Sequence, residues 1–122
     1  MTRNKILLGL AALVGFLSVA AGAFGAHGAV GAAKDWLRTA GEYGLIHALA
    51  VFAAVFVGRE GSRATGVAAW LFLAGAVIFA GSLDAMAISG QLWLGAVTPI
   101  GGLLLLAGWA TLAFAAFARP AS

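Results

Sequence analysis

Long apolar stretches separated by short polar breaks are the feature that most limits how this chain can fold. Four stretches approach the roughly 20 residues that a helix needs to cross the hydrocarbon core of a bilayer, and they cover residues 6–26, 40–57, 64–83 and 92–117. Backbone groups in lipid must be hydrogen-bonded within the protein, which favours helices over open strands. The sequence therefore predicts an all-α membrane protein, a single domain of residues 1–122 with four transmembrane helices in a compact bundle.

The scarcity of charged residues excludes other broad classes of protein. Charged residues make up 9% of the chain and hydrophobic residues 63%, whereas a soluble domain carries about 25% charged residues. A net charge of +3 arises from seven basic and four acidic residues without a basic patch, so it does not indicate nucleic-acid binding. The chain has no cysteine, which excludes disulfides and thiolate metal sites.

The segment between the first two stretches has its own helical pattern. Apolar residues recur at helical spacing, and charged residues recur every four positions on another face: Val30, Ala33, Leu37 and Ala40, and Lys34, Arg38 and Glu42. Trp36 adds a side chain that prefers the membrane interface. We expect residues 30–41 to form a short amphipathic helix in the headgroup region, running into the second span. The alternative is a plain extension of the second helix into solvent.

The other breaks are shorter or more ambiguous. Residues 58–63 form a polar turn, and residues 84–91 are predicted to be a longer, mildly apolar connection. Thr98 and Pro99 allow two interpretations: they begin a helix there, or Pro99 kinks a helix that begins near Leu92. The kink is favoured, because Leu92 opens a segment that resembles an interfacial start.

The distribution of basic residues predicts the orientation in the membrane. Five of them are expected on one side and two on the other: Arg3, Lys5, Arg59, Arg63 and Arg119 against Lys34 and Arg38. Both termini are therefore expected in the cytoplasm, and the protein in the bacterial inner membrane. A secretory signal peptide cleaved near Ala23 is an alternative for the first span, although its apolar run is long for one.

Small residues at four-residue spacing favour close packing between membrane helices. Such pairs occur in the first three spans, and Ala40, Gly44 and Ala48 are an example. The residues that we select for close packing or for a kink are Gly22, Gly25, Gly44, Gly81, Pro99, Gly101 and Gly102.

Polar side chains gather at one depth, toward the outer ends of all four spans. This outer polar cluster consists of His27, Thr39, Glu42, Tyr43, His47, Ser82, Asp84 and Thr98. Ionisable groups at membrane depth are rare and suggest function. Tyr43 and His47 share a helix face because they are four residues apart. His47 is the deepest ionisable group and needs a partner, for which Asp84, Glu42 and Tyr43 are available.

Each of these residues also has a purely structural interpretation. His27 can cap a helix end, and Glu42 can pair with Arg38 on the surface. Tyr43 fits the aromatic belt of a membrane protein, and Asp84 fits an exposed loop. His47 fits a structural hydrogen bond between helices.

Several motifs occur in order along the chain: GAFGAHG at 22–28, TAGEYGLIHALA at 39–50, FAGSLDAMAISG at 79–90 and LGAVTPIGG at 94–102, followed by Gly108 and Trp109. Together they resemble the family known as domain of unknown function 423, also described as the UPF0382 or YwdK-like membrane family, to which the small mitochondrial transmembrane protein 256 is related. The resemblance covers residues 6–117. It supports the fold, argues against cleavage near Ala23, and leaves the function open.

The matching positions and the departures are both specific. The matches are His27; Thr39, Ala40, Tyr43 and His47; Gly81, Ser82 and Leu83; and Thr98, Pro99, Gly101 and Gly102. Gly44 stands where members of the family often carry Gln, and Asp84 where many carry Tyr or another uncharged residue. A mechanism that needs Asp84 would therefore not be that of the family.

Three functions are compatible with the sequence. The first is a small accessory or assembly protein that packs against membrane partners, in the lipid bilayer and within a homo-oligomer or a larger complex. The second is a channel or carrier for a proton, cation or small solute that uses the outer polar cluster. The third, a membrane enzyme with His27 and His47 as zinc ligands, is disfavoured because the spacing matches no ligand motif. We expect no catalysis, no metal, no cofactor and no nucleic acid.

Overall fold

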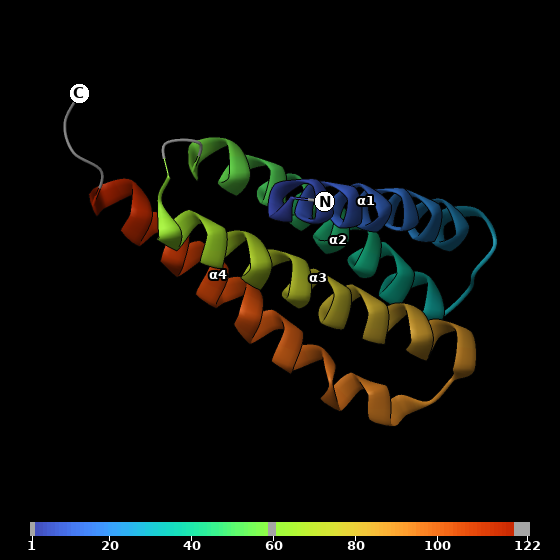
Figure 1. The fold of residues 1–122 in the computed structure, drawn as a ribbon. Coiled ribbons are helices and arrows are strands. Elements are labelled where there is room, and N and C mark those ends of the chain that lie inside the picture. The colour runs from blue at the N-terminus through green and yellow to red at the C-terminus, as the bar shows by residue number, and fades with distance from the viewer. Residues whose placement is uncertain (1, 59–60, 119–122) are drawn as a thin grey trace.

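The computed structural model describes residues 2–58 and 61–118, and these residues are helical with short connections. The helices are α1 (Arg3–His27), α2 (Ala32–Val57), α3 (Arg63–Ser89), the 3-10 helix η2 (Leu92–Ala96) and α4 (Thr98–Ala118), as Figure 1 shows. Within these described ranges, four helical segments are long and apolar enough to cross a membrane, the last of them comprising η2 and α4. The predicted all-helical membrane architecture is confirmed.

Local sequence signals explain where the helices begin and end. Thr2 and Ser62 cap α1 and α3, because their hydroxyls accept hydrogen bonds from the backbone N–H groups of Lys5 and Thr65. Gly90 ends α3 in the left-handed conformation, with φ of 73°, which only glycine adopts readily.

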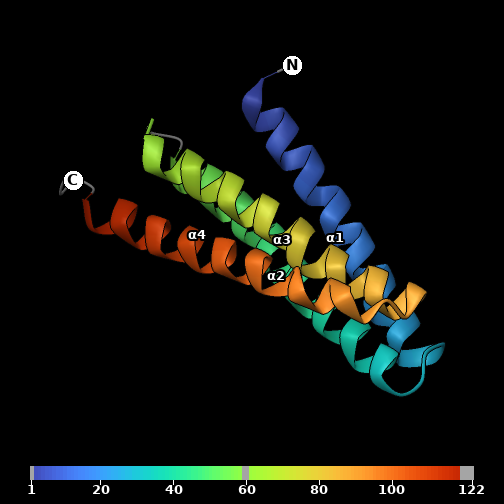
Figure 2. The same ribbon diagram turned by 90° about the horizontal axis from the view of Figure 1, so that it is seen from below.

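The helices pack mainly against their neighbours in the chain. α1 packs on α2, α2 on α3, and α3 on α4, with a smaller contact between α1 and α3. Figure 2 shows α1 crossing the other helices at an angle, with its N-terminal end, the beginning of α3 and the C-terminal end of α4 at one end of the molecule. α3 is thus the central helix, flanked by α2 and α4.

Two buried clusters hold the helices together. One lies nearer the termini and joins α1, α2 and α3 around Leu7, Val51 and Phe72, which are fully buried. The other joins α2 and α3 at the opposite end through Ala40, Ala80, Leu83 and Met86.

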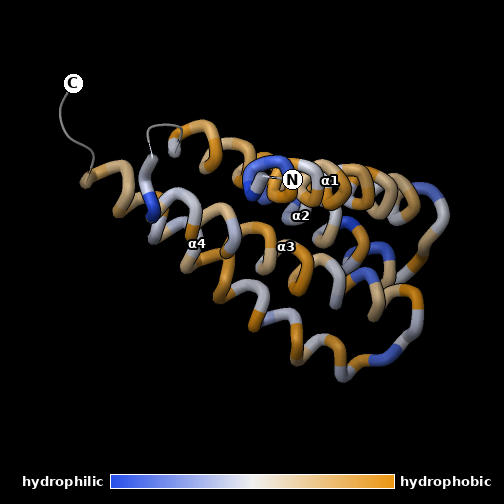
Figure 3. The backbone as a smooth tube through the Cα atoms, viewed as in Figure 1, coloured by the Kyte–Doolittle hydropathy of each residue, from blue (hydrophilic) through white to orange (hydrophobic). Residues whose placement is uncertain are grey.

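The outward-facing surface of the helices is also apolar. Phe16 is 72% exposed and Leu106 is 67% exposed. Figure 3 shows that hydrophilic segments lie mostly toward the helix ends, whereas the long stretches between them are hydrophobic. Lipid-facing side chains of a membrane protein have this distribution.

The predicted interfacial helix over residues 30–41 is wrong. α2 begins at Ala32 and continues without a break to Val57. The reason is that the apolar face of this segment is continuous with that of the span: Leu37, Ala40 and Gly41 are buried together with Gly44 further along. Residues 32–41 are the first turns of α2, as the alternative of a plain extension of the second helix supposed, and they pack against α1.

The predicted connection over residues 84–91 is too long. α3 continues through Asp84 to Ser89, because Leu83 and Met86 are buried against the second cluster and keep the helix in register. The segment from Leu92 is not part of a helix kinked at Pro99: it is a 3-10 turn, and α4 begins at Thr98. Pro99 therefore lies in the first turn of α4, where its missing N–H leaves no hydrogen bond unmade.

Glycines lie where the backbones of neighbouring helices approach each other. A Cβ atom added to Gly101 would lie against the Phe79 backbone and 2.9 Å from the carbonyl oxygen of Gly75. One added to Gly25 would lie 2.9 Å from the Cβ of Leu37. Gly44 lies against Ser18 and Ala80, where α1, α2 and α3 meet.

The other selected glycines have more room. A Cβ atom added to Gly102 would make ordinary contact with the ring of Phe79 at 3.8 Å. One added to Gly22 or Gly81 would meet nothing within 4 Å, although the backbone of Gly22 itself faces Gly41.

Candidate functional site

His47 is the buried centre of the candidate site. It lies in the middle of α2 with 6% of its surface exposed, and both ring nitrogens have partners. Nδ1 lies 2.7 Å from the carbonyl oxygen of Tyr43, and Nε2 accepts a hydrogen bond from Nε1 of Trp109 in α4 at 3.0 Å. An indole N–H can only donate, so these partners assign the neutral tautomer with its proton on Nδ1.

The contact between His47 and Trp109 joins two helices that flank α3. Because α2 and α4 each pack on α3, the hydrogen bond passes over that helix at Phe72. The Phe72 ring is 5.9 Å from the His47 ring and 4.8 Å from the Trp109 ring, measured between centroids. Gly108 leaves the space for it: an added Cβ there would lie 2.7 Å from the Phe72 ring.

Tyr43 extends this group of rings toward the beginning of α2. Its ring is stacked on His47, with centroids 6.0 Å apart, and lies 4.9 Å from Phe79. The resulting aromatic row consists of Phe79, Tyr43, His47, Phe72 and Trp109. Aromatic pairs at such distances add about 0.5–1.5 kcal/mol beyond the area that they bury in water-soluble proteins, so the row fixes the mutual register of α2, α3 and α4.

A pair of hydroxyl groups links the second half of α3 to the beginning of α4. The Oγ of Ser82 lies 2.6 Å from the Oγ1 of Thr98, which is a short hydrogen bond. One hydroxyl donates to the other, and the second donates to a backbone carbonyl: the Phe79 oxygen lies 3.0 Å from the Ser82 hydroxyl, and the Leu94 oxygen lies 3.4 Å from the Thr98 hydroxyl. The two protons are thus used within the protein.

Apart from Tyr43, which is stacked on His47, the remaining members of the outer polar cluster are not gathered around this histidine. His27 and Glu42 are exposed, Tyr43 is 45% exposed, and Thr39 is partly buried. Arg38 lies 3.8 Å from Asp35, one turn before it, in an exposed ion pair. The structure therefore divides the cluster into a bonded core and a peripheral set.

Asp84 differs from the rest of the cluster. Its Oδ1 atom is buried and has no hydrogen-bond partner among the described residues. The residue borders a cavity of about 120 Å³ between α1 and α3, whose other lining includes Leu17, Ser18 and Val77.

Three cavities lined by described residues do not connect the polar groups to one another. They have volumes of about 450, 120 and 100 Å³, and of the eight cluster residues only Asp84 borders one of them. In the described part of the chain, no three His, Asp or Glu side chains come close enough to hold a metal ion. The polar side chains of the candidate site therefore form hydrogen bonds between helices.

Sequence reasoning missed the partner of His47. The side chains of Asp84, Glu42 and Tyr43 were the expected partners, and Trp109 was not among them. The signal was present, because Trp109 belongs to one of the ordered motifs, but helix periodicity cannot tell which face of α4 is opposite His47.

Comparison with protein families matches residues 21–102 to the family described as "Protein of unknown function (DUF423)". This match includes His47 and Thr98 but ends before Trp109. The chain belongs to this family. It confirms the resemblance that the motifs suggested.

Relatives of this DUF423 protein cover nearly the whole chain. A UPF0382 membrane protein of Haemophilus influenzae is 38% identical over 94% of this chain and 95% of its own. The UPF0382 membrane protein YwdK of Bacillus subtilis is 36% identical over 92% and 96%. The UPF0382 inner membrane protein YgdD of Escherichia coli is 40% identical over 88% and 86%. No solved structure matches the chain. The relatives are membrane proteins, and the name of one places it in the inner membrane.

Proposed function

We propose that this DUF423 protein is a small, non-catalytic accessory or assembly protein that packs against partners in the bacterial inner membrane. The proposal rests on the observation that buried polar side chains of this protein are hydrogen-bonded to one another in pairs. His47 is bonded to Trp109 and to a backbone carbonyl, and Ser82 is bonded to Thr98. Groups bonded in this way hold helices together and are not free to bind a solute or move a proton.

The outer surfaces of α1 and α4 are available for a partner. Phe16 and Leu13 on α1 are 72% and 60% exposed, and Leu103 and Leu106 on α4 are 66% and 67% exposed. These two helices each pack on one side only, whereas α3 is central. These two exposed faces are therefore the surfaces on which a partner helix packs.

Site-specific photocrosslinking in native membranes tests this proposal. A photoreactive amino acid at Phe16 or Leu106 is expected to give a discrete adduct with one partner protein or a second copy. The same group at the buried residue Phe72 is the matched control and is expected to give none. If Phe16 and Leu106 yield only lipid adducts, and mild-detergent pull-downs return this chain alone at every expression level, the accessory role is wrong.

The second candidate is a small channel or carrier, and Asp84 is the observation that favours it. Among the described residues, its Oδ1 is a buried side-chain oxygen without a hydrogen-bond partner, and it lies beside the cavity between α1 and α3, where it is available to a cation. Proton or cation flux in proteoliposomes that is abolished by Asp84→Asn, and retained in Asp35→Asn, would support this role. The accessory proposal expects no flux above empty liposomes in any of the three proteins.

A further inference from the structure

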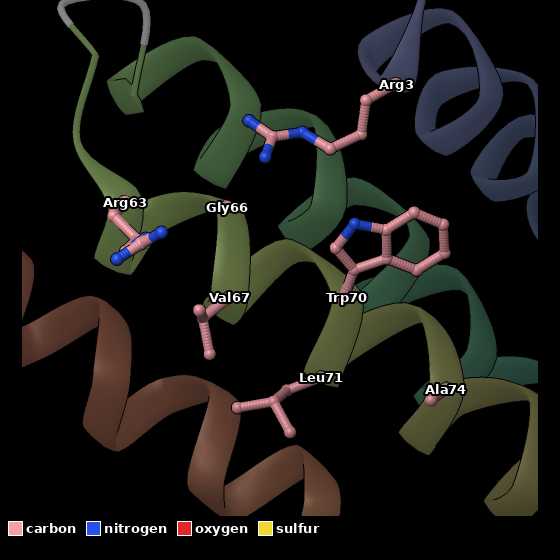
Figure 4. A pocket seen from close by; sticks show the side chains of 7 residues that line it. All are labelled: Arg3, Arg63, Gly66, Val67, Trp70, Leu71 and Ala74. Atoms are coloured by element: carbon pink, nitrogen blue, oxygen red, sulfur yellow. The ribbon is translucent and has the colours of Figure 1, made fainter.

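A groove beside the first turns of α3 carries positive charge at its mouth and apolar side chains along its length. Its volume is about 450 Å³, which is in the range of about 300–1,000 Å³ typical of small-molecule sites. Arg3 comes from α1, and Arg63, Gly66, Val67 and Trp70 come from α3 (Figure 4). Among the described residues, neither arginine is paired with a carboxylate.

Gly66 allows Arg3 to reach this groove from another helix. A Cβ atom added to Gly66 would lie 3.4 Å from an Nη atom of Arg3 and 3.5 Å from its Cζ. The guanidinium group therefore rests on the bare backbone of α3, one turn from Arg63. Figure 4 shows the Arg3 side chain extending from α1 toward the start of α3, where Arg63 lies.

The electrostatic surroundings of the groove favour an anion. α1 and α3 both begin at this end of the molecule, and the N-terminal end of a helix carries a partial positive charge. Two guanidinium groups add full charges, and their planar forks bind phosphate oxygens in pairs. Phosphate is therefore the chemical group that best fits the mouth of the groove.

Below the arginines, the groove is suited to hydrocarbon. Val67, Trp70, Leu71 and Ala74 line it along α3, and the side chains of Val67 and Trp70 are 48% and 41% exposed. An indole in this position marks the boundary between headgroups and acyl chains. A soluble phosphate compound would leave this surface unused.

We propose that this groove binds a phospholipid with an anionic headgroup. Its phosphate lies between Arg3 and Arg63, and an acyl chain lies along Val67 and Trp70. A zwitterionic lipid brings an ammonium group that the two guanidinium groups repel, so the site selects lipids whose only headgroup charge is the phosphate.

Native mass spectrometry of the purified protein tests the proposal. The protein is exchanged into detergent with phosphatidylglycerol or phosphatidylethanolamine of identical acyl chains. Wild type is expected to retain phosphatidylglycerol preferentially. Replacing both arginines, Arg3→Gln with Arg63→Gln, is expected to lower the retained fraction roughly tenfold, because each basic group near the membrane surface contributes measurably to anionic lipid binding.

Two further variants separate the site from general charge effects. Arg38→Gln removes the same charge at the opposite end of the bundle and is expected to leave retention unchanged. Gly66→Leu keeps every charge but displaces Arg3, and it is expected to weaken retention severalfold. Both arginines are exposed, so circular dichroism is expected to show unchanged helicity in the double variant.

Several outcomes would overturn the proposal. Equal retention of both lipids by wild type would remove the selectivity for anionic headgroups. Undiminished phosphatidylglycerol retention in the arginine double variant, or an equal loss in Arg38→Gln, would show that the groove is not the site. If inorganic phosphate displaces all bound lipid, the groove is a site for soluble phosphate instead.

Discussion

His47 is hydrogen-bonded to the carbonyl oxygen of Tyr43 in α2 and to the indole of Trp109 in α4. Apolar packing contacts cannot replace the hydrogen bond from Trp109. The Nε2 atom of a buried imidazole that loses its donor is left without a partner, which is unfavourable in a low-dielectric interior. Asp84 represents the opposite case, because its Oδ1 atom is buried without a partner among the described residues. The two residues therefore respond in opposite directions to substitution.

Trp109→Phe is expected to destabilise the folded protein by about 0.5–2 kcal/mol, because it removes the indole N–H while keeping most of the ring. Unfolding by sodium dodecyl sulfate in mixed micelles measures the change. Trp93→Phe is the matched control, since Trp93 is 65% exposed, and it is expected to change stability by less than about 0.5 kcal/mol. Equal effects of the two substitutions would argue against the hydrogen bond.

Asp84→Asn is expected to raise the stability of the protein by about 1 kcal/mol, because it removes a charge that lies half-buried without a partner. The midpoint of thermal unfolding in detergent at neutral pH measures this change. Asp35→Asn, in an exposed pair with Arg38, is the control and is expected to have little effect. A loss of stability in Asp84→Asn would show that the carboxylate has a partner.

The sequence was sufficient to select His47 as the deepest polar residue and to place Tyr43 on its face. It was insufficient to find Trp109, because the pairing depends on the rotation of α4 about its axis relative to α2. Apolar residues lie on every face of α4, so the hydrophobic periodicity of its sequence does not indicate which face is buried. The same uncertainty explains why Glu42, now exposed, was considered a partner for His47.

At the scale of the helices, close contacts between backbones take the place of a water-driven hydrophobic effect. Helices in lipid gain little from burying apolar area, so van der Waals packing at small residues decides which faces meet. Gly75 and Gly101 allow α3 and α4 to touch, and Gly41 lies 2.8 Å, measured from an added Cβ, from the backbone oxygen of Ser18 in α1. These contacts fix the crossing points of the helices.

Gly101→Ala is expected to destabilise the protein by about 1–3 kcal/mol, since the new methyl group would overlap the α3 backbone. Gly81→Ala is the matched control: its Cβ would meet nothing within 4 Å, and the helix propensity of alanine favours it by up to about 1 kcal/mol. The same unfolding titration measures both. A stable Gly101→Ala variant would contradict the close approach of α3 and α4.

Hydropathy located the four spans, because each needs a long apolar run. It failed at residues 30–41, where a polar stripe suggested a separate helix. Charges on one face of that segment are compatible with α2 simply projecting beyond the membrane. The contacts of Gly25 with Leu37 and of Gly41 with Ser18 reveal that α1 accompanies it. The end of α3 was likewise misplaced, because Asp84 resembles a loop residue until Leu83 and Met86 are seen to be buried.

The whole molecule has its first and last described helix ends on one side, as an even number of spans requires. The distribution of lysine and arginine predicts that this side is cytoplasmic. Arg3, Lys5 and Arg63 lie there, whereas Lys34 and Arg38 lie at the other end.

Reporter fusions test this orientation. Green fluorescent protein fused after Ser122 is expected to fluoresce, because it folds in the cytoplasm, and alkaline phosphatase at the same position is expected to be inactive. Fusions after Gly28, in a chain truncated there, are expected to give the reverse result. Active phosphatase after Ser122 would invert the topology and place the proposed lipid groove in the outer leaflet.

The distance in sequence between His47 and Trp109, 62 residues, has a consequence for biosynthesis. Each helix packs on the helix that precedes it in the chain. The first three helices can therefore associate before translation of the chain is complete. Until α4 leaves the translocon, however, the imidazole in α2 has no indole to bond with. The imidazole of the second helix therefore obtains its indole partner only when the last helix is in place, so a nascent chain that stalls before α4 has a ring nitrogen without this donor.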